Sequence, residues 1–182
     1  MNLWLRLLHL IIASFFRPKL DPVRDVSRLT FRVWPHDLDT SLHMNNGRYW
    51  TLMDLGRTDI MIRSGLWRTI LNQGWVPMVG AGQIRFRREL KPFRTFTLET
   101  RILTWLEGQA VIEHRLVSQA KDGGTLLHAI ALVKVGVYDR KERRFVPISR
   151  LMGEIGVKAE APWVAPEVEA FLRAEETLKS AA

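Results

Sequence analysis

The chain has 182 residues, 47% of them hydrophobic and 25% charged, which fits one globular domain and excludes extensive disorder. It contains no cysteine, so disulfide frameworks, thiolate metal sites and a cysteine nucleophile are excluded. Its net charge of +8, from 27 basic and 19 acidic residues, indicates an anionic partner: nucleic acid, anionic lipid or a phosphate-bearing small molecule. No nucleic-acid-binding motif accompanies the charge, so we expect no nucleic-acid partner.

Residues 1–20 are predicted to form a hydrophobic leader helix. The run from Leu3 to Phe16 is mostly apolar, and Arg17 and Lys19 follow it. As a helix this run would rise about 21 Å, short of the ~30 Å hydrocarbon core of a bilayer, and no signal-peptide cleavage site follows. Two alternatives stay open. The helix lies in an anionic membrane surface, or it packs on the protein's own body or a partner subunit.

Residues 21–182 are predicted to form a single domain with a C-terminal helical extension. In chain order we expect a strand at Leu29–Trp34, a long helix at Tyr49–Arg63, a short helix at Leu66–Asn72, strands at Gln83–Leu90, Phe96–Trp105, Ala110–Ser118 and Leu126–Tyr138, and an amphipathic helix beginning near Pro166. Gly56 weakens the long helix, so it indicates close approach of a packed neighbour. The pattern predicts an α+β fold, an antiparallel β-sheet wrapped around a long central helix, with extra N- and C-terminal helices.

The segment between the first strand and the long helix is the most informative part of the chain. It reads DLDTSLHMNNGRY from Asp37 to Tyr49 and holds the carboxylates of Asp37 and Asp39, the imidazole of His43 and two asparagines. This polar group stands at the N-terminus of an apolar-faced helix. Backbone N–H groups there lack partners and the helix dipole favours negative charge, so the segment can hold or activate an anionic group.

The pattern Asp-x-Asp followed by His-x-Asn-Asn-x-x-Tyr resembles the signature of hotdog-fold thioesterases, especially the four-hydroxybenzoyl-CoA thioesterase-like group and the group around thioesterase superfamily member 6. The segments RVWP at 32–35 and RELKPF at 88–93 also resemble these proteins. The resemblance implies a hotdog fold and an acyl-thioester hydrolase acting on acyl-CoA or acyl-carrier-protein thioesters, without a cofactor. The chain has no internal repeat, so we expect a homo-oligomer, a dimer or a dimer of dimers. Relatives with a hydrophobic leader favour a cytoplasmic protein held peripherally at a membrane.

The resemblance maps the catalytic carboxylate onto Asp39. A carboxylate at a helix N-terminus can attack a thioester carbonyl or activate water, and the free N–H groups can stabilise the oxyanion. The alternative role of Asp39 is to cap the helix. His43 is the second predicted catalytic residue: it orients Asp39, binds substrate or acts as a general acid. Asp37 is interpreted as structural.

Four further positions bear on the site. Ser41 stands where plant acyl-carrier-protein thioesterases carry asparagine, which argues against an Asp-Asn-His mechanism. Asp54 is a reserve candidate for the carboxylate, with an ion pair to Arg48 or Arg57 as its alternative. Asn46 is predicted to cap the helix or to bind the substrate, and Tyr49 is placed in the substrate-binding site.

The basic residues Arg85, Arg87, Arg88 and Lys91 are predicted to bind the phosphates of the thioester carrier, because arginine forks match phosphate geometry. Their alternative is a solvated strand face. No spacing of potential ligands matches a metal site, so we expect no metal. A rival function also stays open, that of a non-catalytic acyl-thioester-binding or membrane-associated hotdog protein.

Overall fold

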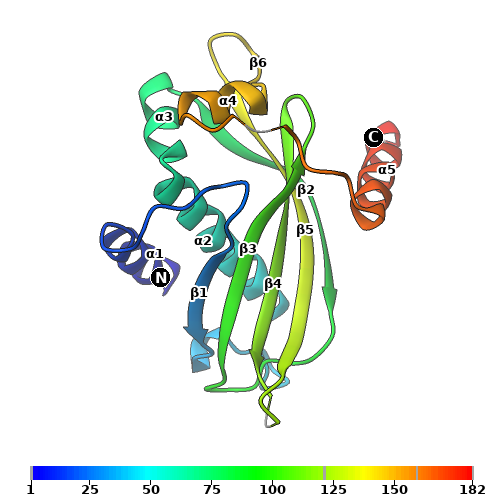
Figure 1. Cartoon of the computed structure of the whole chain (residues 1–182). Helices are drawn as coiled ribbons and strands as arrows, with labels where there is room; N and C mark the ends of the chain where they lie inside the picture. Colours follow the sequence, from blue (N-terminus) through cyan, green and yellow to red (C-terminus); the bar gives the residue numbers. More distant parts are fainter. Residues whose placement is uncertain (1, 121, 159, 182) are drawn as a thin grey trace.

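The computed structural model describes residues 2–120, 122–158 and 160–181. In chain order its elements are α1 (Asn2–Ser14), β1 (Ser27–Arg32), the 3-10 helix η1 (Pro35–Asp37), α2 (Asn46–Ser64), α3 (Leu66–Gln73), β2 (Val76–Phe86), β3 (Thr95–Trp105), β4 (Gln109–Gln119), β5 (Thr125–Asp139), β6 (Arg144–Phe145), α4 (Ile148–Glu154) and α5 (Pro166–Ser180). The antiparallel sheet curls around α2 (Figure 1), which confirms the predicted α+β hotdog architecture.

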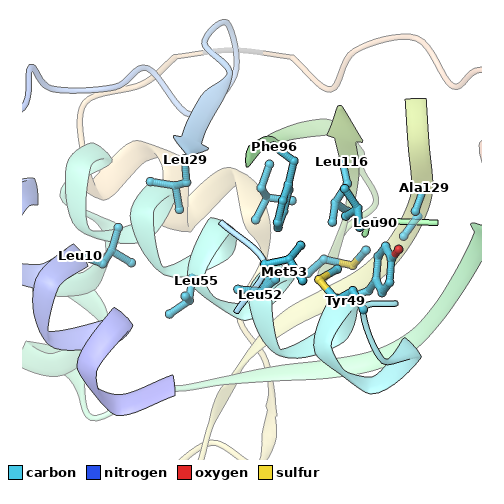
Figure 2. Packing of buried hydrophobic residues seen from close by; sticks show 14 residues of the cluster. Leu10, Leu29, Tyr49, Leu52, Met53, Leu55, Leu90, Phe96, Leu116 and Ala129 are labelled. Carbon is cyan, nitrogen blue, oxygen red and sulfur yellow. The ribbon is translucent and has the colours of Figure 1, made fainter. Parts of the chain in front are cut away.

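The sheet has the strand order β1-β3-β4-β5-β2, and every pairing is antiparallel. Its inner face and α2 share one core. Figure 2 shows Leu52 and Met53 of α2 lying among Phe96, Leu116 and Ala129 of the strands. Burying this apolar surface is the main stabilising term for the fold, and it fixes the rotation of α2 about its own axis.

The ends and the middle of α2 follow from individual residues. The Asn45 side chain caps the first turn by accepting a hydrogen bond from the backbone N–H of Gly47 at 2.8 Å. Gly65 ends the helix in the left-handed conformation, with φ of 88°. A side chain at Gly56 would collide with Thr100 on β3. This confirms that a packed neighbour closely approaches the helix backbone at Gly56.

The two terminal helices cover different parts of the sheet. The leader helix α1 packs on α2 and β1 through Leu3, Leu7 and Leu10, so a part of it belongs to the domain core. On the outer face of the sheet, α5 buries Val168 and Phe171 against the central strands. Because both faces of the sheet are covered at β5, this strand has the nearly continuous apolar sequence from which it was predicted. None of the described helices is both long and apolar enough to cross a membrane.

One strand boundary differs from the prediction. β2 runs from Val76 to Phe86, whereas Gln83–Leu90 was expected. The glycines at 80 and 82 and Pro77 make residues 76–82 look like a loop, but an edge strand tolerates such residues because one side of it needs no ladder hydrogen bonds. Beyond Phe86 the chain leaves the sheet, with the N–H groups of Arg87 and Arg88 both donating to the carbonyl of His128.

The two edge strands of the sheet, β1 and β2, differ in whether their outer side has hydrogen-bonding partners. Carbonyl groups of β1 accept hydrogen bonds from arginines of the leader region: Arg17 donates to the Arg28 carbonyl at 2.8 Å, and Arg6 to the Arg32 carbonyl at 3.4 Å. Among the described residues, β2 pairs with β5 on one side and with no strand on the other. The long edge of β2 is therefore open.

Candidate active site

The Asp-His loop, residues 38–44, forms a small closed turn beside the start of α2. Leu38 and Met44 form an isolated antiparallel bridge, and the N–H of Asp39 donates to the carbonyl of His43 at 2.9 Å. Leu42, at the tip, adopts a φ of 59°, which is uncommon for a residue other than glycine. The turn holds the side chains of Asp39 and His43 on the same side of the loop.

The Asp39 carboxylate has two close contacts within its own loop. Its Oδ1 accepts from the N–H of Ser41 at 2.9 Å, and its Oδ2 lies 3.1 Å from Nδ1 of His43. Both side chains are partly exposed, 24% for Asp39 and 34% for His43. The two predicted catalytic residues are therefore in direct contact and open to solvent. The alternative role of Asp39 as a helix cap is wrong, because Asn45 fills it.

Asp37 is a buried structural carboxylate, as predicted. It is 1% exposed, and its Oδ2 accepts from Arg6 of α1 at 2.6 Å and from the N–H of Trp34 at 3.0 Å. Arg48 of α2 stands 3.7 Å from the other carboxylate oxygen. Three elements, α1, η1 and α2, thus meet at one charged group just before the Asp-His loop.

The predicted ligand-binding residues of α2 lie in different surroundings. Asn46 is exposed at the first position of the helix, and its N–H has no acceptor within the helix. Tyr49 is 3% exposed, with its ring against that of Phe86 on β2 at 5.0 Å between centroids. Burial, opposed by a hydrogen bond with the Leu90 backbone and supported by the Asp39 charge, raises the pKa of Tyr49 to about 12. The phenol therefore stays protonated beside the loop, as part of the core in Figure 2.

The cationic segment, residues 87–94, runs alongside the Asp-His loop. The N–H of Met44 donates to the carbonyl of Leu90 at 2.9 Å, which joins the two segments directly. Arg88 and Lys91 line a cleft of about 740 Å³ together with Arg94 and His128. Of the four predicted phosphate-binding residues, all exposed, Arg85 and Arg87 lie outside this cleft.

The floor of this cleft is a network that sequence reasoning missed. His128 approaches the carbonyl of Glu89 through Nδ1 at 3.1 Å and the hydroxyl of Ser118 through Nε2 at 2.8 Å. Burial lowers the pKa of His128, and the charges of Arg94 and Arg88 lower it further. A neutral ring therefore donates from Nδ1 and accepts from Ser118, while Arg94 donates to the same hydroxyl at 3.0 Å. The network fixes the cationic segment on the sheet.

The reserve carboxylate, Asp54, lies elsewhere. It forms an ion pair with Arg57 one turn along α2, which is the alternative considered for it. Arg57 also contacts Nε2 of His114 at 3.0 Å, and Nδ1 of His114 contacts the Thr100 hydroxyl at 3.0 Å. Burial, and then the Arg57 charge, lowers the pKa of His114 well below its usual value. His114 therefore accepts from Arg57 and donates to Thr100.

A cavity of about 340 Å³ adjoins this ion pair, between the C-terminal half of α2, helices α3 and α4, and the sheet. Its lining is mainly aliphatic, and Asp39 is not part of it. Sequence reasoning missed both the cavity and His114. A signal was present, because His114 alternates with Ile112 and Leu116 and must share their inward face. Within the described residues, no three His, Asp or Glu side chains gather as metal ligands would.

Comparison with known proteins places the chain in a family. The model of the thioesterase-like superfamily matches residues 33–166. Protein THEM6 of Xenopus laevis is 38% identical over 90 residues, which are 50% of this chain and 44% of that protein. Protein THEM6 of Danio rerio is 37% identical over 119 residues, 64% of this chain and 57% of that protein. The match thus spans about half the length of these relatives.

Solved structures of other proteins have the same fold as this chain. The 4-hydroxybenzoyl CoA thioesterase from Pseudomonas sp. strain CBS-3 superposes with a TM-score of 0.63 at 20% identity, covering 71% of this chain and 98% of that one. The probable thioesterase YbaW from Escherichia coli gives a TM-score of 0.63 at 18% identity, covering 70% of this chain and 94% of that one. With the family model matching most of the residues, the chain belongs to the thioesterase-like superfamily.

Proposed function

We propose that the protein hydrolyses acyl thioesters of coenzyme A or of an acyl carrier protein, with Asp39 as the acting carboxylate. The observation that supports this most is the contact between Asp39 and His43, which fixes a solvent-open carboxylate at the N-terminus of α2. Membership of the thioesterase-like superfamily supports the reaction class. Named thioesterases among proteins of the same fold, one of them for 4-hydroxybenzoyl CoA, point the same way.

The chemistry at Asp39 needs a carboxylate and an oxyanion donor. As a nucleophile, an Asp39 oxygen adds to the thioester carbon, the carbon–sulfur bond breaks, and water then cleaves the resulting anhydride. As a general base, Asp39 takes a proton from the water that attacks. In both routes the thiol leaves with a proton, and the N–H of Asn46, which has no acceptor within α2, is the proposed oxyanion donor. Heavy oxygen found in Asp39 after a single turnover in heavy-oxygen water identifies the nucleophilic route, because water must then have attacked the Asp39 carbon of the anhydride.

The carrier's phosphates are assigned to the cationic segment and its cleft. Arg88 and Lys91 line the cleft, and the segment that bears them touches the Asp-His loop through Leu90. A coenzyme A moiety bound there would lead its thioester toward Asp39. The exposed guanidinium and ammonium groups bind phosphate oxygens by charge-assisted hydrogen bonds.

Two further properties are part of the proposal. The first is a homodimer joined at the open edge of β2, where Met78, Val79 and Phe86 are exposed. The second is attachment to an anionic membrane surface through α1. One face of α1 packs on the domain. The exposed Trp4 of α1, with Phe15 and Phe16 after it, at 73%, 79% and 86% exposure beside the exposed Lys19, supports membrane attachment.

The decisive experiment is a hydrolysis assay of the purified full chain against acetyl-, butyryl-, octanoyl-, lauroyl- and benzoyl-CoA, following the released thiol. Turnover of at least one thioester that is lost in Asp39→Asn supports the proposal. A chain that binds these thioesters without turning any of them over is a non-catalytic acyl-thioester binder, and the proposal of hydrolysis then fails.

A further inference from the structure

We propose that an aromatic platform, formed by Trp34 and Phe93 with Arg32 beside both rings, binds the adenine base of coenzyme A at the edge of the cleft of the cationic segment. This inference rests on the proposed function, and it adds the identity of the carrier. A coenzyme A thioester has an adenine base that can stack, whereas the phosphopantetheine arm of an acyl carrier protein has none. The platform therefore favours coenzyme A over an acyl carrier protein.

The two rings of the platform are held together and remain accessible. Trp34 and Phe93 meet edge to face with 6.4 Å between ring centroids, and the two residues are 44% and 51% exposed. The guanidinium carbon of Arg32 lies 5.5 Å from the Trp34 ring centroid and 5.6 Å from the Phe93 ring centroid. Its Nε also donates to the Phe93 carbonyl at 3.1 Å. Nucleobases stack on aromatic rings and on guanidinium planes, so the platform has the chemistry of a base-binding surface.

The backbone fixes the platform as one unit. The N–H of Val33 donates to the carbonyl of Arg94 at 3.0 Å, and the N–H of Phe93 donates to the carbonyl of Val33 at 2.9 Å. The N–H of Trp34 in turn donates to the buried carboxylate of Asp37 at 3.0 Å. These bonds join the residues before η1 to the cationic segment directly beside the two rings. A surface that is already ordered loses little freedom when a ligand binds, so stacking on it contributes to affinity.

Phe93 occupies a backbone position that favours glycine. The N–H of Arg94 donates to the carbonyl of Lys91 at 3.2 Å and closes a turn in which Pro92 is the second residue and Phe93 the third. Phe93 has a φ of 61°. A positive φ after proline is typical of a type II turn, in which glycine or asparagine is the usual third residue. A bulky side chain is strained in this conformation, so the phenyl ring at this turn indicates a role in binding.

The platform adjoins the cleft to which the carrier's phosphates are assigned. Phe93 itself lines this cleft, together with Arg88, Lys91 and Arg94. Arg32 contributes a further positive charge beside the rings. Coenzyme A carries a 3′-phosphate and a 5′-diphosphate on the same ribose that bears its adenine. A base stacked on the platform therefore brings these phosphates to the cations of the cleft, where charge-assisted hydrogen bonds hold them.

The position of Asp39 fits the length of the carrier. Trp34 and Asp39 are five residues apart, so even a fully extended chain would separate their Cα atoms by no more than about 18 Å. The diphosphate and the pantetheine arm of coenzyme A are long enough to bridge this distance. The thioester can therefore reach Asp39 while the adenine stays on the platform.

The first test removes a ring of the platform from the full chain and keeps the turn. Phe93→Asn replaces the phenyl ring by a side chain that tolerates a positive φ, and Trp34→Leu removes the indole. Trp163→Leu, at an exposed position outside the platform, is the matched control. In calorimetry, both platform variants should bind coenzyme A about tenfold or more weakly than the wild type, Phe93→Asn without a lower Tm. Trp163→Leu should bind it as the wild type does. Unchanged affinity in Phe93→Asn overturns the assignment.

The second test asks which part of coenzyme A the platform contacts. Adenosine 3′,5′-bisphosphate has the base and phosphates, whereas phosphopantetheine has a phosphate and no base. Phe93→Asn should weaken binding of the bisphosphate about tenfold or more and leave binding of phosphopantetheine unchanged. If both ligands weaken equally, the ring acts on the cleft and not on the base, which overturns the proposal. A wild type that does not bind the bisphosphate also overturns it.

A third measurement addresses the membrane, because exposed aromatic rings also insert into lipid surfaces. Phe93→Asn and Trp34→Leu are sedimented with phosphatidylserine vesicles. Vesicle binding at the wild-type level together with weakened coenzyme A binding supports the platform. Lost vesicle binding together with unchanged coenzyme A affinity assigns the rings to the membrane and overturns it.

The platform and the proposed function can fail separately. Coenzyme A itself contains no thioester, so its binding is independent of catalysis. Coenzyme A binding that depends on Phe93 supports the platform even if no acyl thioester is turned over. Turnover that is lost in Asp39→Asn, with a coenzyme A affinity that is the same in Phe93→Asn and the wild type, supports the proposed function and overturns the platform.

Discussion

Asp39 and His43 are held together by the loop that joins them, with Nδ1 of the imidazole 3.1 Å from Oδ2 of the carboxylate. The loop's own backbone bond between the same two residues sets this contact. The contact is therefore made within one short loop, and its two members can be tested as a unit.

We expect Asp39→Asn to lower kcat about a hundredfold or more while Tm and oligomeric state stay the same. The amide keeps the shape and accepts the Ser41 hydrogen bond, but it carries no charge for attack or for activating water. Steady-state kinetics with the best acyl-CoA, alongside thermal melting, measure both. The companion variant His43→Asn keeps a donor near Oδ2 and should retain more activity than His43→Ala. Near-normal turnover in Asp39→Asn would move the assignment to Asp54.

Charge removal in the cationic segment should act on KM. The double variant Arg88→Gln/Lys91→Gln is expected to raise KM for acyl-CoA about tenfold or more and to leave kcat nearly intact, because both side chains line the cleft assigned to phosphates. A short thioester without phosphates is the control substrate, and its KM should stay the same. Equal effects on both substrates would show that these side chains act on the fold.

The ion pair between Arg6 and Asp37 should be important for stability. Arg6→Ala leaves the 1% exposed carboxylate without its closest cationic partner, and we expect unfolding free energy to fall by about 2 kcal/mol. The matched control is Arg24→Ala, whose side chain is 86% exposed and 4.0 Å from Asp21, with an expected change within about 0.5 kcal/mol. Urea denaturation of both variants measures the difference. Similar losses in the two would remove the special role of Arg6.

Membrane binding should depend on the exposed aromatic residues of α1 and of the turn that follows it, and not on the buried face of α1. The variant Trp4→Ser/Phe15→Ser/Phe16→Ser is expected to lose vesicle binding more than tenfold with no drop in Tm, because these side chains are exposed. Trp163→Ser, at a site 80% exposed elsewhere, is the control and should bind as the wild type does. Co-sedimentation with phosphatidylserine vesicles is the assay. A full-length protein that does not sediment with them would refute attachment.

Stability should decline in mild acid because of His114. Its folded-state pKa is lowered by burial, so the unfolded chain takes up this proton more readily than the folded one. The contribution of neutral His114 to the free energy of unfolding is therefore complete above pH ~6.5. It is lost as the pH falls below that value, by about 1.4 kcal/mol per pH unit. Denaturation across this range should show a shallower pH slope in His114→Gln. His9→Gln, at an exposed position, should keep the wild-type slope.

The features that sequence predicted well are local. Gly56 predicts a close neighbour of the α2 backbone, although the sequence does not identify that neighbour as Thr100. The predicted cap at Asn46 is wrong by one residue, because Asn45 caps the helix. The Asp-His contact is likewise built within one short loop. Each of these is visible in a window of a few residues, which is why the long helix and the candidate carboxylate could be predicted.

Contacts between residues far apart in the sequence could not be predicted. Arg6 and Asp37 are 31 residues apart, and Arg57 and His114 are 57 apart. Their pairing depends on how helices are placed on the curled sheet, which no local pattern determines. Arg6 lies in the mostly apolar leader, and it faces the domain because a buried carboxylate compensates its charge. The start of β2 was missed for a related reason, since its edge position makes glycine and proline acceptable.

The unequal edges of the sheet limit how far the protein can assemble. In the proposed homodimer joined at β2, the outer edges of the combined sheet would both be β1, where Arg6 and Arg17 already donate to carbonyl groups. A third copy would then find no open strand edge, so we expect edge pairing to stop at two copies and any larger assembly to use the faces of the sheet. The leader thus protects against open-ended stacking of the folded protein. Shortened variants without the leader would leave the β1 edge open as well, and they should be assayed for fibre formation as well as for activity.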